Sequence, residues 1–280
     1  MNINYASIFY YLEDTNKIKY LKEINIDFNK IKRIAIKNEV EDNINKNQIN
    51  NFFEILFSIN NINNNLIYLN IKLMKCTINP ELFENINNFK FLKYLYIERI
   101  NFNKDFIIKL NKLKLLSIIL CENIKLFEIS EELNKLNLVG NNISNIKILE
   151  KVNFKELNKL NLSSNYISDI NILKKVNFKE LKELNLSSNY ISDINILEKV
   201  NFKELKELDL SHNNISNINI LEKVNFKELK ELDLSHNNIS DVNILEKVNF
   251  KELNKLNLSS NNILDFYILE KAKDNFMVIF

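Results

Sequence analysis

The chain is short of the residues that most chemistry in proteins depends on. Glycine and proline each occur once in 280 residues, tryptophan is absent, and there are two cysteines and two histidines. A single glycine, Gly140, excludes a glycine-rich loop that cradles phosphates. Cys76 and Cys121 are too few for a disulfide scaffold, and no Ser/His/Asp or Cys/His arrangement is present. The sequence therefore predicts a protein that is not an enzyme and needs no cofactor.

The chain also lacks an excess of charge and a long apolar run. Thirty-eight Lys and Arg nearly balance 36 Asp and Glu, so the net charge of +2 creates no field that would attract nucleic acid. No apolar run approaches the roughly 20 residues of a membrane span. Tyr5–Leu12 is not preceded by basic residues, which argues against a secretory signal. We expect a cytoplasmic protein with no nucleic-acid partner and no membrane span, and its oligomeric state stays open.

What the chain has in abundance is a tandem repeat. Residues 177–248 hold three nearly identical copies of one segment, and Asn189, Asn213 and Asn237 occupy the same position in the three copies. Six regular units share a 24-residue spacing between equivalent asparagines: Asn141, Asn165, Asn189, Asn213, Asn237 and Asn261. A fixed period of this length indicates one supersecondary unit per copy, and hence a solenoid.

Each unit predicts one strand and one short helical segment. Leu208 and Leu210 alternate with polar residues, so they face inward from a strand whose other residues face outward. Ser192 and Asp193 offer an N-cap for a short α or 3₁₀ segment. Phe202 then turns the chain back and fills the convex side of the core.

The recurring asparagine has a predicted structural role. A chain that turns sharply after every strand leaves backbone N–H and C=O groups inside the coil, and an Asn amide can satisfy both. Stacked copies form an asparagine ladder, in which Cys76 and Cys121 are small, weakly polar substitutes and Ile100 is an interruption. Residues 113–123 fit the repeat in two registers, which differ by two residues. The register with Leu116 and Ile118 as the inward strand residues is preferred to the one with Ile118 and Leu120.

Three segments are expected along the chain. Residues 1–64 form a cap with a degenerate first repeat, residues 65–270 form the solenoid, and residues 271–280 form a closing strand. Within the first segment, apolar spacing predicts two helices, at residues 5–13 and 48–60. It also predicts two short strands, at residues 24–26 and 31–36.

The pattern Leu-x-x-Leu-x-Leu-x-x-(Asn or Cys)-x-Ile resembles the leucine-rich repeat family, and the Ile-Ser-Asp-Ile continuation is similar to its short-helix subclass in protein phosphatase regulatory subunits and internalins. The resemblance covers about residues 66–270. It implies an α/β solenoid with a curved parallel sheet on the concave face, short helical or 3₁₀ segments on the convex face, and no catalytic residues. It also implies a protein-binding concave face.

Two groups of outward residues are candidates for that binding. Strand alternation and a strand spacing of about 4.8 Å place five acidic residues in one patch: Glu183, Glu207, Glu231, Asp209 and Asp233. The patch suits a basic segment of a partner protein. Alternatively, Lys182, Lys206 and Lys230 partly neutralise it and the copies are alike through recent duplication.

The earlier units predict an apolar stripe made by Met74, Tyr94, Tyr96, Ile119 and Val139. Exposed tyrosines and aliphatic residues of this kind mark contacts with partners. Alternatively, residues 1–64 fold over the stripe as a cap.

Three functions follow, in order of preference. The first is a non-catalytic scaffold that binds a partner protein on its concave face, and the second is a regulatory subunit of an enzyme such as a protein phosphatase. The third is a metal-dependent enzyme that uses His212 and His236, which stand beside Asp209 and Asp233. Because the repeat alone explains that pairing, no metal is expected.

Overall fold

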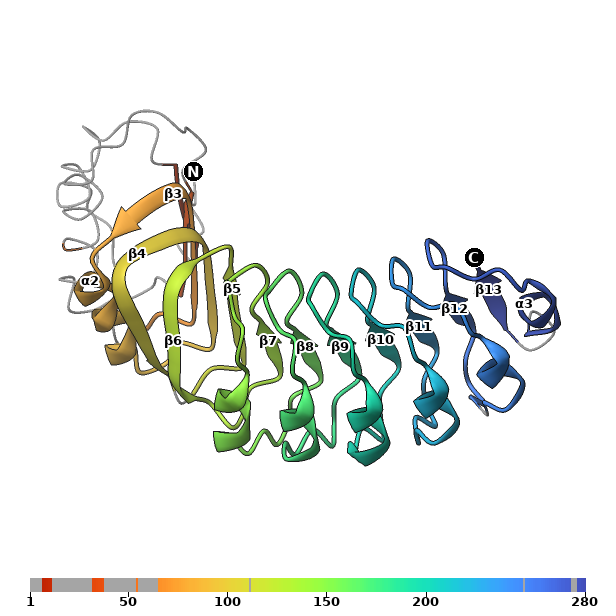
Figure 1. Cartoon of the computed structure of the whole chain (residues 1–280). Coiled ribbons are helices and arrows are strands. Elements are labelled where there is room, and N and C mark those ends of the chain that lie inside the picture. Colours follow the sequence, from red (N-terminus) through yellow and green to blue (C-terminus); the bar gives the residue numbers. More distant parts are fainter. Residues whose placement is uncertain are drawn as a thin grey trace, which may run out of the picture. The chain divides into compact units, whose positions relative to one another are not determined.

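The computed structural model describes residues 7–11, 32–37, 54, 65–110, 112–248, 250–272 and 276–280. The chain divides into two compact units, residues 1–133 and 134–280, and each is described by itself. Figure 1 shows the course of the chain.

The second unit lays down one short strand per repeat. Its parallel strands follow one another in sequence order, with every strand from β8 on paired to the one before it. They are β7 (Lys135–Asn137), β8 (Lys159–Asn161), β9 (Glu183–Asn185), β10 (Glu207–Asp209), β11 (Glu231–Asp233), β12 (Lys255–Asn257) and β13 (Met277–Ile279). From β7 to β12, directly opposed residues are 24 apart in sequence, as the repeat requires.

A helical segment follows each strand from β7 to β12, on the side of the repeat away from the sheet (Figure 1). The five 3₁₀ segments are Lys147–Lys151, Asn171–Lys174, Asn195–Lys199, Asn219–Glu222 and Asn243–Glu246, and an α-helix, α3 (Tyr267–Ala272), follows β12. The N-cap of the third segment is Ile194 and not the predicted Ser192 or Asp193. Asp193 still orders the start of this segment, because its Oδ1 accepts a hydrogen bond from the backbone N–H of Asn195 at 2.8 Å. The fold class expected from the sequence is confirmed.

The core of the second unit lies between the strands and the helical segments. Leu208 and Leu210 are at most 2% exposed and point inward from β10, as their counterparts do in the other repeats. Phe202, predicted to fill the far side, is 1% exposed and stacks on the same residue of the next repeat, Phe226, with ring centroids 6.5 Å apart. Identical residues therefore stack on one another, and each repeat buries the face of its neighbour.

The asparagine ladder forms as predicted. Asn213 is 6% exposed, and its Oδ1 accepts a hydrogen bond from the N–H of Ile191 in the preceding repeat at 2.9 Å. Its Nδ2 donates to the carbonyl of Leu186 at 3.0 Å and to that of Leu210 at 3.1 Å. Each side chain thus joins two turns of the solenoid through buried backbone groups.

The first unit contains longer strands. They are β1 (Ser7–Tyr11), β2 (Arg33–Lys37), β3 (Tyr68–Ile78), β4 (Tyr94–Leu110) and β5 (Leu115–Ile119), paired in that order and all parallel, with β6 (Glu122–Ile129) also pairing β4. A short helix, α2 (Pro80–Glu84), leads into the 3₁₀ turn Asn85–Asn88.

Cys121 takes the ladder position in the first unit. Its Sγ accepts from the N–H of Ile100 at 3.5 Å and donates to the carbonyl of Ile119 at 3.3 Å. The thiol forms no disulfide and is buried, and burial raises its pKa to about 11. The preferred register of this repeat is confirmed, because Leu116 and Ile118 lie opposite Leu95 and Ile97.

Two predictions for the first unit need correction. Residues 7–11 form strand β1 rather than part of a helix, because parallel pairing with β2 satisfies their backbone groups and a short apolar run fits either period. The β3–β4 register shifts by two residues between Lys72 and Cys76, so Met74 does not align with the outward residues of β4 as the sequence suggested.

The remaining predictions for residues 1–64 are only partly open to comparison. The expected strand at 31–36 corresponds to β2 (Arg33–Lys37). The expected strand at 24–26 and, apart from Glu54, the expected helix at 48–60 lie outside the described residues. The boundaries of the predicted cap, solenoid and closing strand stay predictions.

Candidate functional site

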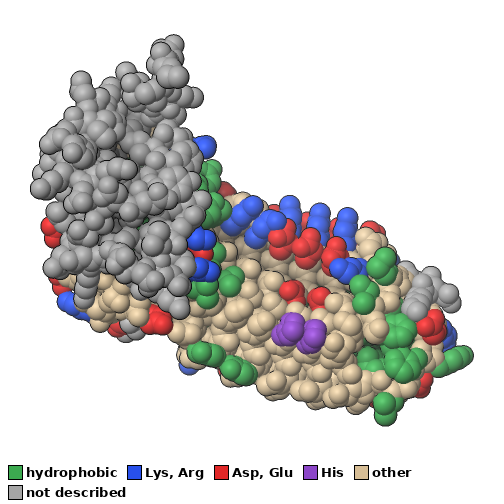
Figure 2. Space-filling view, turned by 90° about the horizontal axis from the view of Figure 1, so that it is seen from above, with side chains coloured by type: hydrophobic (Ala, Val, Ile, Leu, Met, Phe, Trp, Pro, Cys, Tyr) green, Lys and Arg blue, Asp and Glu red, His purple; other side chains and the backbone are tan. Residues whose placement is uncertain are grey.

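The outward side chains of the second unit form straight rows, because every strand pairs in register with the next. The first row, one residue per strand, is Lys135, Lys159, Glu183, Glu207, Glu231 and Lys255. Glu207 lies directly between Glu183 and Glu231, as the 24-residue period predicted. Figure 2 shows acidic side chains gathered on this face with lysines around them.

Lysines close both ends of the glutamate row. Lys159 forms an ion pair with Glu183, and Lys255 lies 3.7 Å from Glu231. Burial and then the charges of Glu183 and Glu231 raise the pKa of Glu207. Glu207 is thus a carboxylate with like charges on both sides, and a cation from outside would relieve that repulsion.

The second outward row contains the two aspartates, and both are held in place. Asp209 Oδ1 accepts from the N–H of Ser211 at 3.0 Å and from its hydroxyl at 2.7 Å, while Oδ2 accepts from Asn185 Nδ2 at 2.9 Å. Asp233 makes the same bonds to Ser235, and its Oδ2 accepts from Asn257. Each Oδ2 therefore has capacity for a further donor.

The two histidines stack on each other immediately after these strands. The ring centroids of His212 and His236 lie 4.0 Å apart with an interplanar angle of 9°, and both side chains are exposed. In the described part of the chain, no three His, Cys, Asp or Glu residues are grouped so as to hold a metal ion. Figure 2 shows the pair beside acidic side chains.

A second stacked pair lies two residues further along the repeat. Tyr166 and Tyr190 have centroids 5.9 Å apart at 17°, and they are 52% and 53% exposed. Their backbones are fixed, because each N–H donates to a carbonyl of the preceding repeat, Ile143 and Ile167 respectively. The two tyrosines are 24 residues apart and so occupy equivalent positions in adjacent repeats, and the structure shows that their rings stack.

The first unit has a tyrosine cluster on the outward face of its strands. The ring of Tyr68 lies 6.5 Å from that of Tyr94 and 5.2 Å from that of Tyr96. Burial and the neighbouring Tyr68 and Tyr94 raise the pKa of Tyr96. The sequence pattern does not include Tyr68 among the predicted outward residues, because it aligns β3 with β4 two residues too far along β3. In the structure Tyr68 lies directly opposite Tyr94.

The other predicted members of the apolar stripe belong to β3 and β5 or follow β7. Ile119 lies opposite Glu98, which pairs with Lys72 at 2.9 Å, so a charged pair occupies that level of the sheet. Val139 is partly exposed and follows β7 in the second unit. Met74 lies within the β3 register shift. A binding role for these residues stays a prediction.

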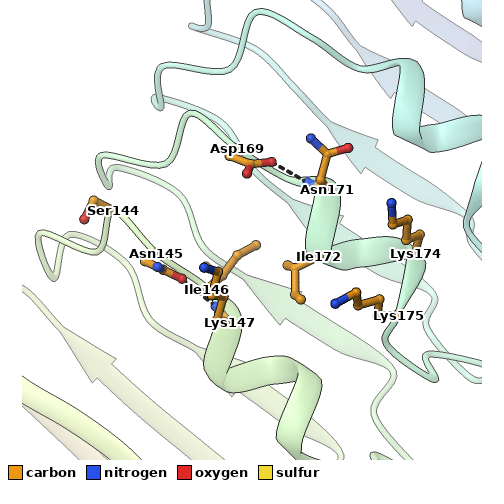
Figure 3. A pocket seen from close by; sticks show the side chains of 9 residues that line it. All are labelled: Ser144, Asn145, Ile146, Lys147, Asp169, Asn171, Ile172, Lys174 and Lys175. Atoms are coloured by element: carbon orange, nitrogen blue, oxygen red, sulfur yellow. Dashed lines mark hydrogen bonds between the residues drawn. The ribbon is translucent and has the colours of Figure 1, made fainter.

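A hollow of about 280 Å³ lies between two successive repeats near their 3₁₀ segments (Figure 3). Ile146 and Ile172 line it together with polar side chains that include Asp169 and Lys175. Asp169 accepts from the N–H of Asn171 at 2.8 Å, and Lys175 pairs with Glu150 at 2.9 Å. These polar groups serve the local structure of the repeat, and the hollow offers no convergent catalytic groups.

The comparisons with known proteins agree with this geometry. A family model described as "Leucine rich repeat" matches residues 155–215 and 179–239, and one described as "Leucine Rich repeats (2 copies)" matches residues 227–271. No curated protein matches the sequence closely enough to count as a relative. None of the helices in the described part of the chain has the length and apolarity that crossing a membrane requires.

Several solved structures resemble the chain. An internalin (inlF) of Listeria monocytogenes has a TM-score of 0.52 at 18% identity, with 95% of this chain and 93% of that chain covered. TLR13, solved in complex with ssRNA13, has a TM-score of 0.56 at 20% identity, with 90% and 36% covered. The APL1 leucine-rich repeat domain has a TM-score of 0.50 at 19% identity, with 90% and 65% covered. At these identities the likeness shows the fold alone.

Proposed function

Because residues 155–271 belong to the leucine-rich repeat family, we propose that the chain is a non-catalytic scaffold that binds a basic segment of a partner protein on the strand face of its second unit. Leucine-rich repeats are commonly interaction modules. The observation that carries the proposal is the in-register row of Glu183, Glu207 and Glu231 beside Asp209 and Asp233.

The surface is suited to binding because it is already ordered. The backbone groups behind it are tied by the asparagine ladder, and the two aspartates are fixed by hydrogen bonds to Ser211 and Ser235. A rigid surface loses little conformational entropy when a partner docks, which favours affinity. The clustered negative charge would also steer a positively charged partner toward it.

A protein is a better candidate than a nucleic acid. The TLR13 structure contains single-stranded RNA, but five carboxylates on the strand face of this chain would repel phosphates. A regulatory subunit would use the same surface, with an enzyme as the partner. The cytoplasmic location expected from the sequence stays a prediction.

The test is a selection of peptides from a random library with the full chain as bait, followed by binding measurements on a charge-reversed variant. The variant is Glu183→Lys, Glu207→Lys and Glu231→Lys together, and lysine is already native at this row position in β7, β8 and β12. We expect the selected peptides to be rich in Lys and Arg and to lose at least about tenfold in affinity for the variant.

The control variant carries the same change of charge in the same repeats, at the exposed positions Glu180, Glu204 and Glu228, which lie outside the strands. It should bind the selected peptides as the native chain does, apart from a small long-range effect. Selected peptides without an excess of basic residues, or equal losses in the two variants, would show that the strand face is not the site.

A further inference from the structure

Two stacked pairs of rings, called the ring platforms here, accompany the acidic residues: His212 with His236 and Tyr166 with Tyr190. Binding of a basic segment by charge attraction alone would not need such rings. In the repeats of β10 and β11, Asp209 and Asp233 stand where the other regular repeats have asparagine, and His212 and His236 stand where Ser164, Ser188 and Ser260 occur. The two imidazoles form one stacked pair, and Tyr166 and Tyr190 form another. All four residues are exposed, so the parts of the rings that stacking leaves uncovered are open to a ligand.

The two platforms are within reach of one short peptide. The tyrosine pair belongs to the repeats of β8 and β9 and the histidine pair to those of β10 and β11, so the pairs lie two strand spacings apart along the array, about 10 Å. The carboxylates of Asp209 and Asp233 lie in the row beside the histidines, each with an Oδ2 able to accept one more hydrogen bond.

We propose that the partner's basic segment is recognised through arginine rather than lysine. The proposal rests on the function proposed above and names the chemistry of the same surface. A guanidinium group is planar, stacks on aromatic rings and donates several hydrogen bonds in a fixed fork. An ammonium group has the same charge and is also attracted to an aromatic face, but it is not planar, so it makes neither the stacked contact nor the forked hydrogen bonds.

The geometry supplies both kinds of contact in adjacent rows. A guanidinium that lies against the His212–His236 pair has the carboxylates of Asp209 and Asp233 in the neighbouring row to accept its N–H groups. A second guanidinium on the Tyr166–Tyr190 pair gains from stacking alone, because Asn161 and Asn185 take the place of the aspartates in those two repeats. Charge complementarity therefore selects a cation, and the rings select the flat one.

The repeats themselves supply the control substitutions. Tyr166→Asn and Tyr190→Asn install the residue that occupies the same position at 142, 214, 238 and 262. His212→Ser and His236→Ser install the serine found at that position in three sister repeats, where it holds the same positive φ of 54° to 56°. The quadruple variant removes both platforms and leaves every carboxylate and the expected fold in place.

The experiment measures the binding of fluorescein-labelled hexa-arginine and hexa-lysine to the full chain by fluorescence anisotropy at physiological salt. We expect hexa-arginine to bind the native chain about tenfold more tightly than hexa-lysine, from modest stacking gains at two exposed platforms. The quadruple variant should lower hexa-arginine binding close to the level of hexa-lysine and weaken hexa-lysine binding much less, because lysine makes only the weaker, unstacked contact with the rings.

The outcomes separate the two proposals. Equal binding of the two peptides to the native chain, abolished by the triple Glu→Lys variant, would overturn the arginine inference and leave the proposed function standing. An arginine preference that survives in the quadruple variant would also overturn the inference. Failure of both peptides to bind the native chain would overturn the inference together with the basic-segment part of the proposed function.

Discussion

Removal of a single ladder side chain, Asn213→Ala, should destabilise the protein strongly although it deletes only an amide. The N–H of Ile191 has the Asn213 Oδ1 as its only acceptor among the described residues, at 2.9 Å, and Asn213 is 6% exposed. After truncation that N–H is buried without a partner, which costs about 1–3 kcal/mol.

The donor side of the amide contributes less. The carbonyl of Leu186 also accepts from Asn189 Nδ2, and that of Leu210 also accepts from Asn237 Nδ2, each at 3.0 Å. Both carbonyls therefore keep a partner when Asn213 is truncated. With the lost bonds and a small cavity added to the orphaned N–H, we expect a loss of about 2–4 kcal/mol in the free energy of unfolding.

Two further substitutions at the same position separate the donor from the acceptor. Asn213→Cys should cost roughly half as much as alanine, because Cys121 shows that a thiol in this position both accepts from and donates to the backbone. Asn213→Asp should cost more than alanine, because it keeps the acceptor but buries a carboxylate against carbonyl oxygens.

The assay is urea unfolding followed by far-ultraviolet circular dichroism, with the m-value checked for constancy because a repeat array can unfold in parts. The control is Asn214→Ala at the adjacent exposed position, expected within about 0.5 kcal/mol of the native chain. An alanine variant at 213 that loses less than about 0.5 kcal/mol, or cysteine and aspartate variants of equal stability, would refute the ladder as a source of stability.

Three more expectations follow from the structure. Because the pKa of Glu207 is raised, the folded state binds more protons than the unfolded state at pH values just above the ordinary glutamate pKa, and the contribution of Glu207 to the free energy of unfolding falls as pH rises through this range. NMR titration should show the raised pKa of Glu207, and the double variant Glu183→Gln and Glu231→Gln should lower it. Leu120 has a φ of 53°, and Leu120→Gly should raise stability by about 0.5–1 kcal/mol while Leu120→Ala does not, as urea unfolding would show. The Cys121 thiol, with its pKa raised to about 11, should resist iodoacetamide at pH 8 in the native chain and react in urea; rapid alkylation of its tryptic peptide under native conditions would contradict the buried ladder position.

The sequence alone determined the repeating features of this protein. The 24-residue period places Glu207 opposite Glu231 and assigns Asn213 to the interior, because in a solenoid each strand is positioned by its own repeat and pairs with the next copy. The same reasoning found the substitute role of Cys121. A period read from one sequence is enough to fix which residues are neighbours in the regular part.

The tertiary structure decided what the period does not encode. The two-residue shift between β3 and β4 brings Tyr68 beside Tyr94, and pairing with β2 makes residues 7–11 a strand. The stacking of His212 on His236 depends on side-chain torsions and a positive φ, which spacing leaves undefined. Equivalent positions in a repeat follow from backbone geometry, whereas irregular insertions and side-chain orientation follow from packing, and only coordinates resolve packing.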